Sequence, residues 1–235
     1  MVNQADGAAT LSIPPDAEDD TPLDVTDSLS GSTLAALQEF LAEQKQAAEN
    51  AEGDPFAEDW GLSQFWYTRE TAHKVAEEVV EKSDGGRQPI ACVACPSLFR
   101  ELKASFPEAN VHLFEFDNRF SSFGSQFTFY DYNKPVRLPA EQKGHFQVVV
   151  ADPPYLSDEC IQKTAQTVEY LSCSNASRLI LTGAVQRDRV WKYLGMRPCV
   201  FRPEHQKKLG NEFLVYTNYE ACQRLGGWDK SLIDP

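Results

Sequence analysis

The 235-residue chain has a net charge of −13 at pH 7. Residues 1–59 hold 14 acids and one base and account for all of this charge, since the other 176 residues hold 21 acids and 21 bases. A protein that binds DNA or RNA needs clustered basic residues to neutralise phosphates, so a nucleic-acid substrate is disfavoured. There is no apolar run long enough to cross a membrane and no leader pattern in the first thirty residues, so we expect a soluble, intracellular protein without membrane association.

An acidic tail, a short helix and an aromatic segment are expected at the start of the chain. Residues 1–28 are rich in acids and prolines, so we expect a disordered tail, which is also able to attract a basic protein surface. Residues 29–59 are expected to hold a helix with one apolar face, followed by a linker. The consecutive aromatic residues Phe65, Trp66 and Tyr67 cannot all face inward, so they fit either an ordinary core or the wall of a substrate channel.

From Thr68 onward, apolar patterns of helical period and of strand period alternate along the chain. This alternation predicts an α/β fold with a doubly wound, Rossmann-like sheet, and the two final strands predict a C-terminal antiparallel hairpin at its edge. We therefore expect an α/β domain at 60–220 and a C-terminal tail at 221–235. Strands are expected at 89–95, 111–116, 126–131, 146–151, 178–182, 198–202 and 211–219, and helices at 68–82, 97–105, 158–171 and 184–194.

The six cysteines are spread through expected strands and helices, which is typical of buried apolar side chains rather than of a disulfide framework. Cys92 and Cys95 have C-x-x-C spacing, which leaves metal binding or redox chemistry open. Both lie in an apolar run, however, and no second pair has zinc-ligand spacing, so we expect no metal site.

A ligand site is expected at the carboxyl ends of the first two strands. In doubly wound folds an acid about twenty residues after the first strand binds ribose hydroxyls, and Glu115 has this spacing from Cys95. Asp117 is a second candidate for this role; in the alternative interpretation Asp117 caps a helix and Glu115 faces solvent. The first strand ends in Ala94, Cys95 and Pro96 rather than in a glycine-rich loop, so a cofactor with a pyrophosphate is disfavoured.

The most informative motif is Asp152-Pro153-Pro154-Tyr155, which follows the apolar strand expected at 146–151. The Asp152 carboxylate and the Pro153 carbonyl are acceptors that can hold an N–H group, and the prolines restrict the loop, so the motif suits a reaction at a nitrogen atom. In the alternative interpretation, Asp152 only caps the next helix. The motif resembles the Asp/Asn-Pro-Pro-Tyr/Phe signature of class I S-adenosylmethionine-dependent N-methyltransferases, which act on adenine N6, glutamine or lysine.

Longer segments sharpen this resemblance. From about residue 29 to 219, the chain looks like the eukaryotic elongation factor 1-alpha lysine methyltransferase 1 family, whose members were once described as N6-adenine methyltransferases. The resemblance implies the class I methyltransferase fold, S-adenosylmethionine as cofactor, and methylation of a lysine on elongation factor 1-alpha in the cytoplasm. The matching segments are 34–40, 60–67, 114–120, 129–133, 151–157 and 211–213.

The resemblance also implies roles for individual residues. Asp152 and the Pro153 carbonyl would orient the lysine amine for direct SN2 transfer, and Tyr155 would wall the channel together with the aromatic residues at 65–67. Asp131, at the end of the third expected strand, would hold the adenine edge. Residues 94–96, Glu115 and Asp117 would contact the cofactor.

Two other functions stay open at this point. One is adenine-N6 methylation of DNA or RNA, which uses the same chemistry but lacks basic surface here. The other is a non-catalytic scaffold with a methyltransferase fold, which the missing glycines would suit. His205 and Asn211 are assigned no catalytic role, because lone polar residues near turns usually bond locally.

Overall fold

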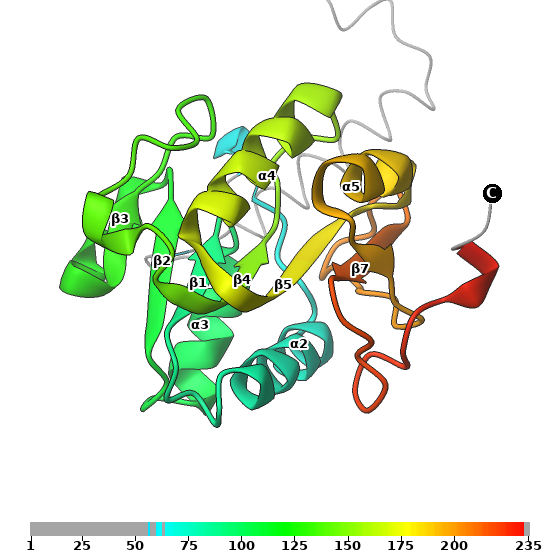
Figure 1. Cartoon of the computed structure of the whole chain (residues 1–235), viewed down its shortest axis with the longest axis horizontal. Coiled ribbons are helices and arrows are strands. Elements are labelled where there is room, and N and C mark those ends of the chain that lie inside the picture. Colours follow the sequence, from blue (N-terminus) through cyan, green and yellow to red (C-terminus); the bar gives the residue numbers. More distant parts are fainter. Residues whose placement is uncertain (1–55, 57–59, 63, 233–235) are drawn as a thin grey trace, which may run out of the picture. The chain divides into compact units, whose positions relative to one another are not determined.

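The apolar runs identified in the sequence form a seven-stranded sheet with the order β3-β2-β1-β4-β5-β7-β6 (Figure 1). The computed structural model describes residues 56, 60–62 and 64–232, so the expected tail at 1–28 and almost all of the expected helix and linker at 29–59 lie outside the described residues. The strands are β1 (Ile90–Val93), β2 (Val111–Glu115), β3 (Phe127–Phe129), β4 (Phe146–Ala151), β5 (Ser172–Gly183), β6 (Arg197–Pro198) and β7 (Phe213–Thr217).

The topology confirms the predicted doubly wound sheet of the class I methyltransferase type. The strands β1 to β5 pair in parallel, and β7 pairs antiparallel with both β5 and β6. The predicted C-terminal antiparallel hairpin is therefore confirmed as β6 and β7. The strand order reverses between β1 and β4, and a doubly wound sheet binds its ligands at the carboxyl ends of the strands beside such a reversal.

Each central strand is buried on both faces because alternate side chains enter different cores. In β1, Ile90 and Cys92 pack into one hydrophobic cluster, whereas Ala91 and Val93 pack into the other. Residues 148–151 of β4 alternate between the same two clusters. Continuous apolar strands of this kind are typical of a parallel sheet covered by helices on both faces.

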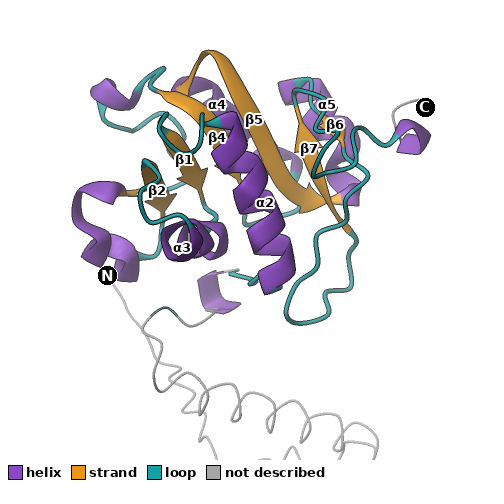
Figure 2. Ribbon diagram, turned by 90° about the horizontal axis from the view of Figure 1, so that it is seen from below, coloured by secondary structure: helices purple, strands orange, loops and turns teal. Residues whose placement is uncertain are grey.

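The helices supply those two covers. The cluster on one face contains side chains of α2 (Arg69–Lys82) and α3 (Pro96–Ser105), and the cluster on the other contains side chains of α4 (Asp158–Leu171) and α5 (Arg187–Leu194). Figure 2 shows α2 and α3 lying together on one side of the strands. The side chain of Thr68 accepts a hydrogen bond from the backbone N–H of Thr71 at 3.2 Å, so α2 begins at the cap that the sequence predicts.

The expected strand at 126–131 is shortened to Phe127–Phe129. It is preceded by a 3-10 helical segment, η3 (Asn118–Gln126), which the sequence analysis did not predict. This segment begins at Asp117, whose side chain accepts a hydrogen bond from the backbone N–H of Arg119 at 2.9 Å. The turn after β2 is therefore stabilised by the Asp117 cap, as the alternative interpretation of the sequence had it.

The expected strand at 198–202 is reduced to the two residues of β6. Beyond it, the backbone N–H groups of Val200 and Phe201 donate to the carbonyl groups of Gly227 and Leu225, at 2.9 and 3.0 Å. Leu225 is fully buried in the hydrophobic cluster that contains α2. The chain after β6 thus pairs with residues near the C-terminus instead of extending the sheet.

Candidate active site

A cavity of about 410 Å³ lies at the carboxyl edge of the parallel strands. The loops after β1, β2, β3 and β4 line it, together with the segment before α2 and the loop before β7. This location includes the reversal of strand order between β1 and β4, where such folds bind ligands. The lining residues are 61, 62, 64–66, 94, 96, 97, 115, 116, 130–133, 152–156, 205, 209–211 and 213.

Asp152 lies directly after β4, and its backbone N–H donates a hydrogen bond to the Val93 carbonyl of β1 at 3.0 Å. It lines the cavity. Burial raises the pKa of its carboxyl to about 8; the Tyr67 hydroxyl opposes this rise and the neighbouring Glu115 adds to it. The helix cap of α4 is Ser157, so the alternative interpretation of Asp152 as a cap is wrong.

The rest of the motif places one buried and one exposed group at the cavity. Pro153 is buried, whereas the ring of Tyr155 is 47% exposed. Tyr155 meets the ring of Tyr132 edge to face, with the ring centroids 5.6 Å apart, and the ammonium group of Lys163 lies 5.5 Å from the Tyr132 centroid. The two tyrosines and Pro153 thus line the cavity next to the Asp152 carboxyl.

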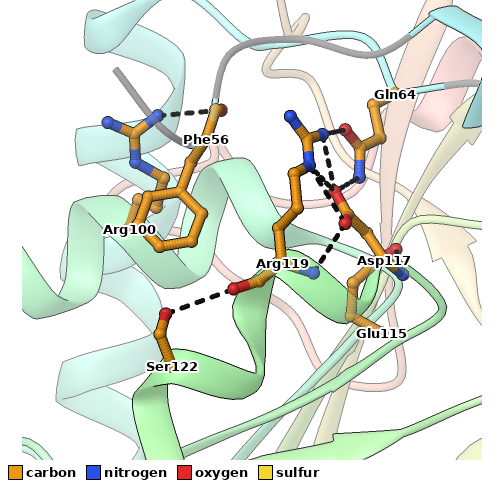
Figure 3. A network of polar contacts seen from close by, with 7 residues as sticks. All are labelled: Phe56, Gln64, Arg100, Glu115, Asp117, Arg119 and Ser122. Carbon is orange, nitrogen blue, oxygen red and sulfur yellow. Dashed lines mark hydrogen bonds and ion pairs between the residues drawn. The ribbon is translucent and has the colours of Figure 1, made fainter. Parts of the chain in front are cut away.

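Glu115 and Asp117 have different surroundings although they follow the same strand. Glu115 is 5% exposed and lines the cavity, so the alternative in which it faces solvent is wrong. Burial raises the pKa of Glu115 to about 7. Asp117 does not line the cavity: its carboxyl is directed at Arg119 and Gln64 (Figure 3) and caps η3, as the alternative interpretation had it.

Asp131 follows β3 and lines the cavity. Its carboxylate accepts a hydrogen bond from the backbone N–H of Asn133 at 2.9 Å and lies 3.4 Å from the Lys134 ammonium nitrogen. The preceding residue, Tyr130, is buried, and its hydroxyl lies 2.9 Å from the Thr167 hydroxyl. These contacts hold the end of β3 against α4 and leave the Asp131 carboxylate at the cavity wall.

The glycine-poor loop after β1 reaches the cavity through Ala94 and Pro96. Ala94 has a φ of +50°, in the left-handed region that glycine normally occupies, and its backbone N–H donates to the Phe114 carbonyl at 2.8 Å. Pro96 is the first residue of α3, where a missing N–H costs no helical hydrogen bond. The Cys95 side chain is buried behind the cavity wall, with its sulfur 3.6 Å from the Val150 carbonyl oxygen.

Replacing Ala94 with glycine should stabilise the protein. The left-handed conformation costs an alanine about 1–2 kcal/mol. Glycine avoids this cost but lowers the stability by about 0.4–1 kcal/mol, because it gives the unfolded chain more conformational freedom. We expect Ala94→Gly to raise the free energy of unfolding in urea by up to about 1 kcal/mol. The control is Ala91→Gly in the buried centre of β1, which should destabilise the protein; a loss of stability in Ala94→Gly would contradict the argument.

The aromatic segment before α2 contributes both to the core and to the cavity. Phe65 and Trp66 line the cavity, and Trp66 is 8% exposed. Tyr67 is buried behind them, and burial together with the Asp152 carboxyl raises the pKa of Tyr67 well above its usual value. Tyr67 therefore stays protonated beside Asp152. The core interpretation therefore applies to Tyr67, whereas Phe65 and Trp66 line the cavity, as the wall interpretation requires.

The comparisons with known proteins agree on one family. A family model described as "Probable N6-adenine methyltransferase" matches residues 58–221. The chain is 45% identical over 214 residues to human EEF1A lysine methyltransferase 1, covering 88% of this chain and 96% of that protein. The chain belongs to the EEF1A lysine methyltransferase 1 family. It is also 40% identical to the Drosophila melanogaster protein-lysine N-methyltransferase CG9154, covering 84% of this chain and 96% of that protein.

Solved structures with lower identity show partial similarity to this chain. Protein Atu636 of Agrobacterium tumefaciens, described as a predicted O-methyltransferase, has a TM-score of 0.45 at 13% identity, covering 62% of this chain and 79% of that one. TrmN from Thermus thermophilus has a TM-score of 0.40 at 14% identity, covering 60% of this chain and 47% of that one. The family match at 58–221 includes every residue that lines the cavity.

Sequence reasoning missed several residues that line the cavity. His205 and Asn211, which were assigned no catalytic role, line the cavity. The His205 ring packs between Tyr67 and Phe213, with centroid distances of 4.4 and 4.5 Å. No local pattern identifies His205, because its loop reaches the cavity only by pairing with the segment before α2. Other lining residues that were missed include Gln64, Phe116, Tyr130 and Tyr132.

Within the described part of the chain, no group of three His, Cys, Asp or Glu side chains comes together as a metal site. Cys92 and Cys95 are free and buried in the structure. None of the helices in the described residues is long and apolar enough to cross a membrane.

Proposed function

We propose that this protein transfers a methyl group from S-adenosylmethionine to a lysine side chain of elongation factor 1-alpha, in the cytoplasm. The observation that carries the proposal is the half-buried Asp152 carboxyl, which lies beside Glu115 in an aromatic-lined cavity of a chain 45% identical to human EEF1A lysine methyltransferase 1. The lysine nitrogen attacks the methyl carbon, the carbon–sulfur bond breaks, and S-adenosylhomocysteine leaves with the electron pair.

The lysine must lose its ammonium proton before it can attack. A partly enclosed cavity favours this loss, because burial destabilises the charged form of an amine. Asp152 and the Pro153 carbonyl then accept N–H hydrogen bonds from the neutral amine, which aims its lone pair at the methyl group. Tyr155, Phe65 and Trp66 surround the side chain and attract the ammonium form as it enters.

The cofactor would lie across the carboxyl ends of β1, β2 and β3. Glu115 would accept hydrogen bonds from the ribose hydroxyls, and Asp131 would hold the adenine edge. The loop at 94–96 would contact the methionine part of the cofactor. The positive sulfonium would then be near two carboxyl groups whose pKa values are raised, so its binding favours their ionised forms.

An adenine-N6 methyltransferase remains the second candidate, because the family model carries that description. Among the described residues, those lining the cavity include no lysine or arginine, which a bound nucleic acid would need near its phosphates. A non-catalytic scaffold fits less well. Burial raises the pKa of both Glu115 and Asp152 in this one cavity, and Glu115 adds to the rise at Asp152; carboxyl groups perturbed in this way are typical of functional sites.

The test is a methyl-transfer assay that offers tritiated S-adenosylmethionine with purified elongation factor 1-alpha, DNA and RNA in parallel. We expect label on the elongation factor alone, and mass spectrometry should locate it on a lysine. Label confined to nucleic acid would refute the proposal in favour of adenine methylation. Label on none of the three, from protein that binds S-adenosylhomocysteine in calorimetry, would favour the scaffold.

A further inference from the structure

A cluster of polar side chains holds one end of the aromatic segment that lines the cavity (Figure 3). Gln64 Nε2 donates a hydrogen bond to Asp117 Oδ2 at 3.0 Å, and Gln64 Oε1 accepts one from Arg119 Nη2 at 3.2 Å. Gln64 is 7% exposed and Asp117 is 4% exposed. The amide thus has a carboxylate for its donor and a guanidinium for its acceptor, which fixes its orientation.

Asp117 is itself held by several donors. Arg119 Nη2 lies 2.6 Å from Asp117 Oδ2, and the backbone N–H of Arg119 donates to Asp117 Oδ1 at 2.9 Å. Burial would raise the pKa of Asp117, but the hydrogen bonds from Arg119 and Gln64 outweigh it and hold this pKa below its usual value. Asp117 is therefore a fixed carboxylate, and it anchors Gln64 rather than facing the cavity.

The cluster is directly connected to the cofactor side of the cavity. The backbone N–H of Asp117 donates to Glu115 Oε1 at 3.0 Å. The other end of the aromatic segment is tied to a different loop, where the backbone N–H groups of Thr68 and Gln206 donate to the carbonyls of Glu204 and Trp66, both at 2.8 Å. Hydrogen bonds thus hold both ends of the segment, and the hydrogen bonds of Gln64 are the ones nearest Glu115.

We infer that Gln64 and Asp117 are positioning residues that hold Phe65 and Trp66 in place as the wall of the substrate channel. The inference rests on the proposed function for its kinetic consequence. Without the Gln64 contacts, the segment loses its hydrogen bonds nearest Glu115, and the wall has more conformations to lose when the substrate side chain enters. The protein substrate should therefore bind more weakly. Gln64 also hydrogen-bonds to the Glu115 carboxyl, so the cofactor should lose some affinity as well, but less than the protein substrate.

Exchanging the positions of the amide and the carboxylate tests this inference. Gln64→Glu places a second carboxylate against Asp117, and we expect KM for elongation factor 1-alpha to rise at least about tenfold, with kcat changed by less than about threefold and the Kd of S-adenosylhomocysteine raised by less than the KM. The double variant Gln64→Glu/Asp117→Asn again has one amide and one carboxylate, and each position keeps its side-chain length. Arg119 can then pair with the carboxylate at position 64. It should recover most of the lost affinity for the protein substrate.

A second variant covers the case in which Gln64→Glu does not fold. Gln64→Leu removes both hydrogen bonds without adding charge, and it should raise KM at least about fivefold and speed amide exchange at 65–67 but not in β4. The matched control is Gln142→Leu, because Gln142 bonds to Thr128 at 3.1 Å and does not line the cavity; its KM should be unchanged.

The outcomes separate this inference from the proposed function. A KM within about twofold of wild type in a folded Gln64 variant, or a double variant no better than Gln64→Glu, would overturn the positioning role. If the wild-type protein methylates nothing, the proposed function fails, but amide exchange at 65–67 still decides the positioning role. Unchanged exchange in Gln64→Leu would then refute it.

Discussion

Asp152→Ala should abolish methyl transfer, lowering kcat at least about 10³-fold, while S-adenosylhomocysteine still binds within about threefold of wild type. The loss is large because the carboxyl is the charged acceptor at the cavity wall, and its removal leaves the amine without its strongest orienting partner. Stopped assays with tritiated cofactor measure the rate, and titration calorimetry measures the binding of S-adenosylhomocysteine.

Two further variants identify what Asp152 does. Asp152→Asn keeps one acceptor oxygen, so it should lose only about 10–100-fold if the residue orients the amine, and as much as Asp152→Ala if it must take the proton. Asp158→Ala is the matched control, because Asp158 is a nearby acid that pairs with Arg189 and does not line the cavity. Its activity should be normal, and normal turnover in Asp152→Ala would refute the proposed role.

The affinity for S-adenosylhomocysteine should rise about tenfold between pH 6 and pH 8, and Glu115→Gln should remove this rise. Burial holds the pKa of Glu115 at about 7, so its carboxyl is mostly protonated at pH 6 and mostly ionised at pH 8. Only the ionised carboxylate accepts hydrogen bonds from both ribose hydroxyls. Calorimetry across this pH range gives the dissociation constants directly.

The choice of ligand and a control variant separate the effect of Glu115 ionisation on binding from that of Asp152 ionisation. S-Adenosylhomocysteine has no sulfonium charge, so the ionisation of Asp152 near pH 8 should affect its binding little. Asp152→Asn should therefore keep the pH dependence, whereas Glu115→Gln should bind at least about tenfold more weakly at pH 8. An unchanged pH dependence in Glu115→Gln would show that this carboxyl does not bind the ribose.

The accuracy of the sequence interpretation depended on how local each signal was. The strand at 146–151 and the helix at 158–171 have the predicted bounds, because a continuous apolar run and a serine cap are properties of neighbouring residues. The strand expected at 198–202 ends early because its backbone pairs with Leu225 and Gly227, which lie far along the chain. Tertiary hydrogen bonds override strand propensity there.

The same distinction applies to the candidate site. Asp152 and Glu115 could be selected from the sequence, because each directly follows or ends an apolar strand whose carboxyl end faces the cavity. Spacing alone favoured Glu115 over Asp117, but it could not predict that Asp117 is directed away from the cavity, since that depends on Gln64 and Arg119 capturing its carboxyl. His205 was missed because only the folded chain brings it beside Tyr67.

The sequence by itself determined the α/β class, the order of most elements, the motif that suits chemistry at nitrogen, and the family resemblance. These follow from periodicity and from short motifs, which are encoded by residues close together in the chain. Only the tertiary structure decided which carboxyls enter the cavity, which aromatic side chains form its wall, and what holds that wall in place. Those properties depend on side chains from separate segments, which meet only after the sheet and its two helical covers have packed.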